Sequence, residues 1–347
     1  MNQPANAKPE VLQIVQRLVE GNELSEADSQ TFFQSVVAGE VDEILLAAAL
    51  SAFKVRTQTA SELAGAAKAL LESATVYPRP DYPFIDVVGT GGDGFNTINL
   101  STIAAITAAA CGCKVIKHGN RSISSVSGSF DFLEKLSVNF NITPDESQAQ
   151  VDQHGLCFLF APNYHSGVRH ATNVRKTLKV RTIFNLLGPL VNPARPPHML
   201  LGVADPDLLN PMATVLSRLG CEHAFVVHGS GLDEVAIHGP TSVVEVKGES
   251  LNEFELSPES FGAESHQLDD LICHDAEKSH ARSQAALEGQ GNPAENAAVC
   301  VNVALMMSLF GNDDLKNNYS LAMDCLLKGQ PIQLVSSMVE NQPSTNE

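Results

Sequence analysis

The chain has 347 residues, enough for about two domains of ordinary size and too many for a small scaffold that depends on disulfides. It carries 40 Asp and Glu against 22 Lys and Arg, and the resulting net charge of −18 disfavours general binding to nucleic acid. Hydrophobic residues make up 44% of the chain and charged residues 18%, which is the composition of a folded globular protein.

The segment from about residue 9 to 75 is predicted to form a bundle of four short helices. Apolar residues recur there at three- and four-residue spacing, and each stretch begins near Ser, Thr or Asp. Gly21 and Gly39 stand where the first two helices are expected to end. The sequence VYPRPDYP at 76–83 cannot continue a helix, so a linker is predicted there.

Beyond the linker, short apolar runs rich in β-branched residues alternate with helical stretches. This alternation predicts an α/β fold, with a small all-helical domain followed by a large domain whose central, mainly parallel sheet is flanked by helices. Strands are expected at 84–89, 114–119, 157–162, 198–203, 223–229 and 241–246. The basic stretch at 163–182 is predicted to be helical without packing on the sheet, residues 257–298 are polar, and helices close the chain through about 340.

A glycine-rich loop, GTGGDG at 89–94, follows the first expected strand and formally matches the G-x-G-x-x-G pattern of dinucleotide-binding folds. The next helix cannot begin before Asn99 or Ser101, and the following strand ends in basic residues where a ribose-binding carboxylate is needed. Glycines still let backbone N–H groups approach an anion, and a helix N-terminus adds its positive end. The loop is interpreted as a phosphate site, with a tight turn and a helix cap as the alternative.

The charge distribution favours the phosphate interpretation. Between residues 114 and 195 there are 10 Lys and Arg against 5 Asp and Glu, a surplus of +5, which leaves −23 for the rest of the chain. Within that segment, KHGNRSISSVSGSFD at 117–131 combines Lys117 and Arg121 with several serines, as an anion with many oxygens requires. An ordinary solvated face is the alternative.

A pair of adjacent acids, Asp233 and Glu234, follows the strand expected at 223–229. Adjacent acids in a loop are most often solvated. If a polyphosphate binds at the same edge of the sheet, these carboxylates are suited to hold Mg²⁺ together with the phosphate and water.

Four blocks together carry a family resemblance: GTGGDGFNTINLST at 89–102, KHGNRSISSVSGSFDFLE at 117–134, FLFAPNYHSGVRHATNVRKTLKVRTIFNLLGPLVNP at 158–193 and VVHGSGLDEV at 226–235. The blocks follow a helical segment and have the order and spacing of one family. From about residue 10 to 335, the chain resembles the anthranilate phosphoribosyltransferases. The sequence pattern and the resemblance together predict a helical domain at 1–78 with a returning segment at about 163–185. They also predict a phosphoribosyl-diphosphate-binding α/β domain at 79–162 and 186–340, and a frayed tail at 341–347.

The resemblance implies transfer of the phosphoribosyl group from phosphoribosyl diphosphate to the amino group of anthranilate, in tryptophan biosynthesis. It assigns the sugar diphosphate to Gly89, Gly92, Asp93, Thr97, Asn99, Ser101, Thr102, Lys117, Asn120, Arg121, Ser125 and Ser129. It assigns anthranilate to Gly89, Asn120, Arg175, His118, His165 and Pro189, and Mg²⁺ to Ser101, Asp233 and Glu234.

The chemistry agrees with these assignments and needs no covalent nucleophile. Departure of diphosphate from the anomeric carbon builds negative charge on the leaving group, which Mg²⁺ and Lys117 are expected to stabilise. Arg175 is expected to bind the anthranilate carboxylate with two hydrogen bonds and so to aim the amine at the ribose.

Four residues depart from the family pattern. Phe130 replaces a small residue after the GS pair, Ser166 and Gly167 replace Pro–Ala after His165, and Lys179 stands where Gly is common. None of them is an assigned ligand, so the departures concern the shape of the loops around the anthranilate entrance.

Two other functions are alternatives to this one. A pyrimidine nucleoside phosphorylase shares the domain pattern but has no use for the paired acids or for Arg175, and a non-catalytic relative that binds nucleic acid should be basic. The expected partners are small-molecule substrates, with no nucleic acid and no membrane. The resemblance also implies a second copy of the chain, bound through the helical domain. No stretch has the length of a membrane span or the form of a secretory signal, so a cytoplasmic location is expected.

Overall fold

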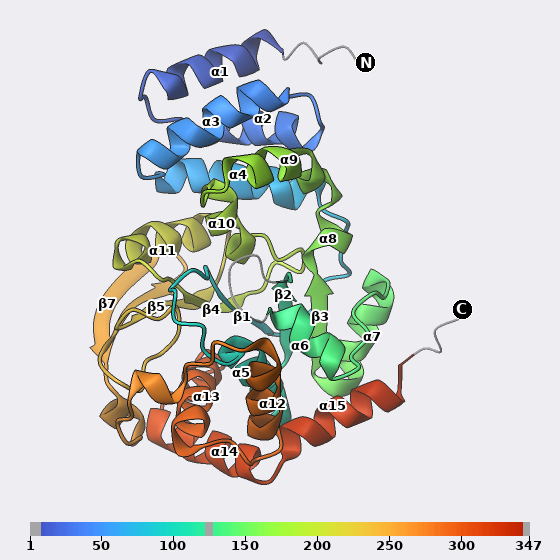
Figure 1. The fold of residues 1–347 in the computed structure, drawn as a ribbon, viewed down its shortest axis with the longest axis vertical. Helices are drawn as coiled ribbons and strands as arrows, with labels where there is room; N and C mark the ends of the chain where they lie inside the picture. The colour runs from blue at the N-terminus through green and yellow to red at the C-terminus, as the bar shows by residue number, and fades with distance from the viewer. Residues whose placement is uncertain (1–7, 122–127, 343–347) are drawn as a thin grey trace.

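The computed structural model describes residues 8–121 and 128–342, and Figure 1 shows the helical bundle at the top of the molecule, above the α/β part. The bundle begins with the four predicted helices, which are α1 (Pro9–Val19), α2 (Glu26–Val37), α3 (Glu43–Val55) and α4 (Ala60–Ser73). Gly21 and Gly39 follow the first two helices with φ of 87° and 75°, so the predicted stops are confirmed. Residues 76–83 form no helix or strand, as expected of a linker.

The chain returns to this bundle after its third strand. The short helix α8 (Ala161–Tyr164) and the 3₁₀ turn η1 (Ser166–Val168) lead into α9 (Arg169–Leu178), which packs against α2 and α3. The helix α10 (Ile183–Leu187) and the 3₁₀ turn η2 (Gly188–Leu190) then lead back toward the sheet. The basic stretch is therefore helical and lies away from the sheet, as predicted, while the numerical domain boundaries stay a prediction.

Seven strands form one sheet in the order β3-β2-β1-β4-β5-β6-β7. Their bounds are β1 (Ile85–Gly89), β2 (Val115–Gly119), β3 (Leu156–Phe160), β4 (His198–Gly202), β5 (His223–Gly229), β6 (Thr241–Lys247) and β7 (Ser250–Leu256). The first five are parallel, whereas β6 and β7 are antiparallel, which confirms a mainly parallel sheet.

The strand order reverses beside β1. The chain runs from β1 outward to β2 and β3, then crosses to β4 on the other side, where Ile85 pairs with His198 and Gly89 with Gly202. Open α/β sheets bind ligands outside the carboxyl ends of the strands at such a reversal. The glycine-rich loop begins at this point of the sheet.

Both faces of the sheet are buried. Leu200, Phe225 and Val227 belong to the apolar cluster formed with α5 and α13, whereas Leu201 and Val226 belong to the cluster that extends into the helical bundle. The helices of the α/β part are α5 (Leu100–Ala110), α6 (Ser129–Lys135), α7 (Pro144–His154), α11 (Leu209–Arg218), α12 (Ala276–Leu287), α13 (Pro293–Ser308), α14 (Leu315–Leu327) and α15 (Gln330–Glu340), with 3₁₀ turns η3 (Pro206–Leu208), η4 (Pro258–Phe261) and η5 (Leu268–Asp270).

Two elements were missing from the sequence-based prediction. The strand β7 lies at the edge of the sheet and most of its residues are exposed, so it lacks the apolar run of a buried strand. The helix α12 lies within the polar stretch 257–298 and buries the small residues Ser279 and Ser283. Among the described helices, none has the length and apolarity that crossing a bilayer requires.

Candidate active site

The glycine-rich loop between β1 and α5 borders a cavity of about 580 Å³ at the carboxyl ends of the strands, which we name the loop cavity. Every site residue predicted from the sequence lines it except Ser125, which lies outside the described residues. The cavity brings together Gly89, Gly92, Asp93, Thr97, Asn99, Ser101, Thr102, Lys117, His118, Asn120, Arg121, Ser129, His165, Arg175, Pro189, Asp233 and Glu234.

The paired acids reach the cavity because two glycines leave room for their backbone. A Cβ atom on Gly89 would lie 2.1 Å from Asp233 Oδ2, and a Cβ atom on Gly202 would lie 1.6 Å from the Asp233 carbonyl oxygen. These glycines are the last residues of β1 and β4 and pair with each other. The loop after β5 therefore lies directly on the point where the strand order reverses.

The acids repel one another in this position. The Gly91 N–H donates a hydrogen bond of 2.6 Å to Asp233 Oδ2, and the Ser101 hydroxyl donates to Glu234 Oε1. Burial, together with the charge of Asp93, raises the pKa of Asp233 to about 6. Burial, together with the charge of Asp233, raises the pKa of Glu234 to about 8. A divalent cation would relieve this repulsion, so the residues present are compatible with Mg²⁺.

Lys117 is the buried cation of the cavity, at 2% exposure, and it donates a hydrogen bond to the Val87 carbonyl oxygen. Burial lowers its pKa, while the charges of Asp86 and Glu234 oppose that shift. The Asp86 carboxylate accepts a 2.8 Å hydrogen bond from Asn192 Nδ2, and burial raises its pKa to about 6. The negative charge of Asp86 thus favours the protonated form of Lys117 and opposes the effect of burial.

The anthranilate residues predicted from the sequence come from the sheet and from the segment that returns to the helical bundle, which carries His165 and Arg175. The Arg175 guanidinium lies 5.1 Å from the centre of the Phe184 ring, and its burial lowers its pKa. The rings of His118 and His165 are 5.3 Å apart and edge to face. Burial lowers the pKa of both, and among the described residues His118 Nε2 has no hydrogen-bond partner.

Arg121 lines the cavity but is engaged elsewhere. Its guanidinium pairs with Asp131 at 2.9 Å and with Glu134 at 2.8 Å on α6. The hydrogen bonds that it donates to Glu134 and Asp131 raise its pKa. Its predicted contact with the sugar diphosphate stays a prediction, and binding would have to compete with this ion pair.

The residues that depart from the family pattern are accommodated locally. Phe130 is fully buried against Phe140 and Phe160, with ring centres 4.9 and 5.0 Å away. A Cβ atom at Gly167 would lie 2.7 Å from the Val37 carbonyl oxygen, so close packing on α2 requires glycine. Lys179 ends α9 in the left-handed region, at φ 53°, which explains why glycine is common there.

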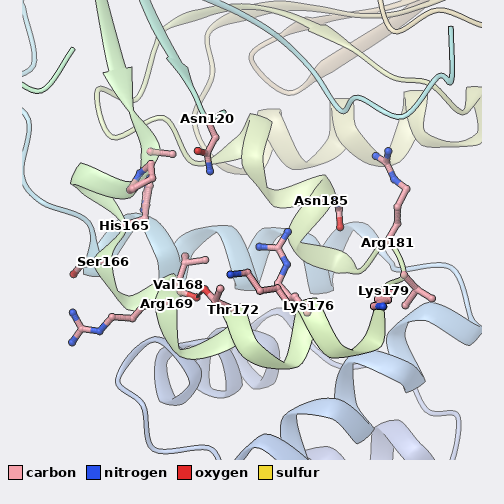
Figure 2. A pocket seen from close by; sticks show the side chains of 14 residues that line it. Asn120, His165, Ser166, Val168, Arg169, Thr172, Lys176, Lys179, Arg181 and Asn185 are labelled. Atoms are coloured by element: carbon pink, nitrogen blue, oxygen red, sulfur yellow. Dashed lines mark hydrogen bonds between the residues drawn. The ribbon is translucent and has the colours of Figure 1, made fainter. Parts of the chain in front are cut away.

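A second cavity, of about 640 Å³, adjoins the first along α9, and we name it the α9 cavity. Figure 2 shows Arg169, Thr172 and Lys176 along the helix, with Asn120 across from them. Among the described residues that line it there is no Asp or Glu, whereas its cations are Arg169, Arg175, Lys176, Lys179 and Arg181. The surplus of positive charge in the sequence is therefore concentrated on this wall.

The residues that line the loop cavity without having been predicted from the sequence include the polar side chains of Thr90, Arg181 and Asn185. Thr90 is part of the glycine-rich motif, and the other two lie within the quoted block at 158–193. The local surplus of basic residues was the signal that could have identified Arg181. Nothing in the pattern distinguishes Asn185, which accepts a 2.9 Å hydrogen bond from the Thr182 N–H at the start of α10.

The fold and this cavity define a glycosyl transferase of the kind that joins a helical bundle to an α/β domain. The helical bundle domain of the glycosyl transferase family matches residues 12–74, and its a/b domain matches residues 81–332. The second match alone covers more than half of the chain.

The relatives identify the family more narrowly. The anthranilate phosphoribosyltransferase of Vibrio parahaemolyticus is 51% identical over 325 residues, which are 94% of this chain and 98% of the relative. The Thermus thermophilus enzyme of that name superimposes with a TM-score of 0.88 at 36% identity, covering 94% of this chain and 98% of that chain. The Saccharomyces cerevisiae enzyme, in complex with PRPP and Mg, does so with a TM-score of 0.87 at 27% identity, covering 97% and 99%. The chain belongs to the anthranilate phosphoribosyltransferase family.

Proposed function

We propose that this chain transfers the phosphoribosyl group from 5-phosphoribosyl 1-diphosphate to the amino group of anthranilate, giving N-(5-phosphoribosyl)anthranilate and diphosphate, in tryptophan biosynthesis. The observation that carries the proposal is a single cavity at the reversal of strand order, lined by the glycine-rich loop, the paired acids and four cations. Relatives about half identical over nearly the whole chain support the same reaction.

The diphosphate is assigned to the glycine-rich loop and the start of α5. Backbone N–H groups of the loop and the positive end of the helix favour an anion there, and the buried ammonium of Lys117 adds a full charge. Asp233, Glu234 and Ser101 are the residues that would hold Mg²⁺, which the yeast relative binds with PRPP. The metal would neutralise charge on the leaving diphosphate.

Anthranilate is assigned to the side of the cavity that Arg175 lines. The guanidinium can bind the carboxylate with two parallel hydrogen bonds, while Asn120 offers an amide at the junction of the two cavities. Holding both substrates in one orientation accelerates attack of the amine by positioning. A yeast relative in complex with 4-fluoroanthranilate supports this substrate class.

The nucleoside phosphorylase alternative leaves the acid pair and the α9 cations without a role, and the net charge of −18 opposes a nucleic-acid partner. Neither is supported by a described feature.

A homodimer through the helical bundle and a cytoplasmic location are part of the same proposal. Ile44 and Val55 of α3 are 84% and 89% exposed, and Val19 of α1 is 61% exposed. Large apolar side chains so exposed on one bundle are suited to a protein interface. Sedimentation of the purified chain tests the dimer, and a monomer at micromolar concentration would contradict it.

One assay tests the reaction. The protein is mixed with anthranilate, phosphoribosyl diphosphate and Mg²⁺, and the loss of anthranilate fluorescence is followed. We expect turnover that requires all three components. An unchanged signal at every enzyme concentration would refute the proposed function.

A further inference from the structure

Arg181 connects the two cavities. It follows α9 on the chain segment that returns from the helical bundle, and it lines both the loop cavity and the α9 cavity. In Figure 2 its side chain extends away from the C-terminal end of α9, on the opposite side of the view from His165. No assigned substrate contact so far involves this residue.

The Arg181 side chain lies directly on the glycine-rich loop. Its Nη2 donates a hydrogen bond of 2.9 Å to the Thr90 carbonyl oxygen. A Cβ atom on Gly92 would lie only 1.4 Å from Nη1, so the guanidinium occupies the space that any other residue at 92 would need. Gly92, at φ 82°, is one of the residues assigned to the sugar diphosphate.

The charge of Arg181 has no counterpart in the described part of the chain. The guanidinium is half-buried, and none of the described Asp or Glu residues lies within ion-pair distance of it. By contrast, Arg121 on the other side of the loop cavity pairs with two acids. A half-buried guanidinium with donors left over from a single hydrogen bond is a strong binder of phosphate oxygens, which match its planar fork.

We propose that Arg181 binds the diphosphate of the sugar substrate, from its place against Thr90 and Gly92 of the glycine-rich loop. This inference rests on the proposed function, because the ligand is the leaving group of that reaction. Arg175 differs in that it stacks on Phe184, and in the described part of the chain no hydrogen bond joins its side chain to the glycine-rich loop. The two arginines thus divide the two anionic substrates between them.

The test compares Arg181→Gln and Arg181→Lys with the control Arg79→Gln, which removes one exposed cation from the linker outside both cavities. Calorimetry measures binding of phosphoribosyl diphosphate with Mg²⁺ when anthranilate is absent. We expect the Kd to rise about 10- to 100-fold in Arg181→Gln, since hydrogen bonds to charged groups are lost, and less in Arg181→Lys. The KM for anthranilate should change less than about threefold, and Arg79→Gln should match the wild type.

Chemical rescue separates ligand binding from bracing of the loop. Millimolar guanidinium ion should restore part of the affinity of Arg181→Ala for phosphoribosyl diphosphate. The same ion should leave the affinity of the wild type unchanged. Unchanged affinity in Arg181→Gln, or equal losses for both substrates together with a lower melting temperature in every Arg181 variant, would overturn the inference. If the wild type itself fails to bind phosphoribosyl diphosphate with Mg²⁺, the proposed function fails first.

Discussion

The loop cavity and the α9 cavity together form a cleft, whose two walls are built differently. The acid wall consists of Asp93, Asp233 and Glu234, on loops at the ends of β1 and β5, and glycines fix it by letting backbone approach backbone. The cationic wall consists of Arg169, Arg175, Lys176, Lys179 and Arg181, on α9 and the segment after it. In the described residues, none of these five cations forms an ion pair with an acid.

The difference teaches how each wall suits its ligand. The backbone of Asp233 packs closely on Gly202, since a Cβ atom added there would lie 1.6 Å from the Asp233 carbonyl oxygen. This packing restricts movement of the acids. A hard cation such as Mg²⁺ needs oxygen ligands in fixed positions. The cations of the second wall lie on long side chains, whose charged groups match carboxylate or phosphate oxygens.

Removing the acid wall should have the largest effect. The double variant Asp233→Asn, Glu234→Gln keeps the size of both side chains and should lower kcat by about 1,000-fold, because the leaving group loses its metal. Fluorescence assays over a Mg²⁺ series measure the effect. The control Glu253→Gln removes an exposed acid on β7 and should leave both rate and Mg²⁺ dependence unchanged. Wild-type dependence on Mg²⁺ in the double variant would show that the acid wall is not the metal site.

The cationic wall is tested by Arg175→Ala. We expect the KM for anthranilate to rise about 10- to 100-fold, since two charged hydrogen bonds are lost, while the KM for phosphoribosyl diphosphate stays within about threefold. Steady-state kinetics with each substrate varied in turn measure the split. Arg175→Lys keeps the charge but not the planar fork, so it should recover only part of the loss. Equal effects on both substrates would remove the distinction between the walls.

The two walls should also respond differently to pH. The pKa of Asp233 is raised to about 6 and that of Glu234 to about 8, so below pH 8 a proton must leave when Mg²⁺ binds. Mg²⁺ affinity should therefore rise from pH 6 to 8, by up to about tenfold per unit for one released proton, and level off above. The KM for anthranilate should vary little, because arginine does not titrate there. Calorimetry with Mg²⁺ at three pH values measures the first effect, and constant affinity would contradict it.

The smallest expected effect concerns the end of the cationic wall. Lys179 has φ 53°, which costs an L-residue up to about 1 kcal/mol relative to glycine. Lys179→Gly should raise the free energy of unfolding by roughly that amount, and Lys179→Asn, which tolerates the left-handed region, should raise it less. Urea denaturation of the three proteins measures the order, and an equal or lower stability of the glycine variant would contradict it.

Much of this molecule could be predicted from local sequence. Gly21 and Gly39 mark helix ends by their conformational freedom, and alternating strands and helices imply a parallel sheet. The residues of the loop cavity share a few short motifs, so their grouping followed from recognising those motifs together. The exposed edge strand β7 and the polar helix α12 were not predicted, because their residues lack a strong apolar period.

Contacts between segments distant in sequence could not be predicted. The sequence around Gly202 does not indicate that this glycine pairs with Gly89, or that Asp233 packs on the two glycines. Strand register arises only when the sheet is assembled. The same holds for Arg181, whose contact with Thr90 joins residues 91 positions apart in the chain. The assigned residues gather in one place because these long-range contacts form.

The position of α9 also bears on how the protein is made. Ala171 and Val174 of this helix are buried in the cluster that α1 to α4 begin, yet they follow three strands of the sheet in the chain. On a ribosome, the faces of α2 and α3 that pack against α9 stay uncovered by that helix until residue 178 has been synthesised. Apolar surface that is exposed during synthesis makes a partly folded chain prone to association. We therefore expect a chaperone to bind nascent chains truncated before α9 more strongly than those that include it.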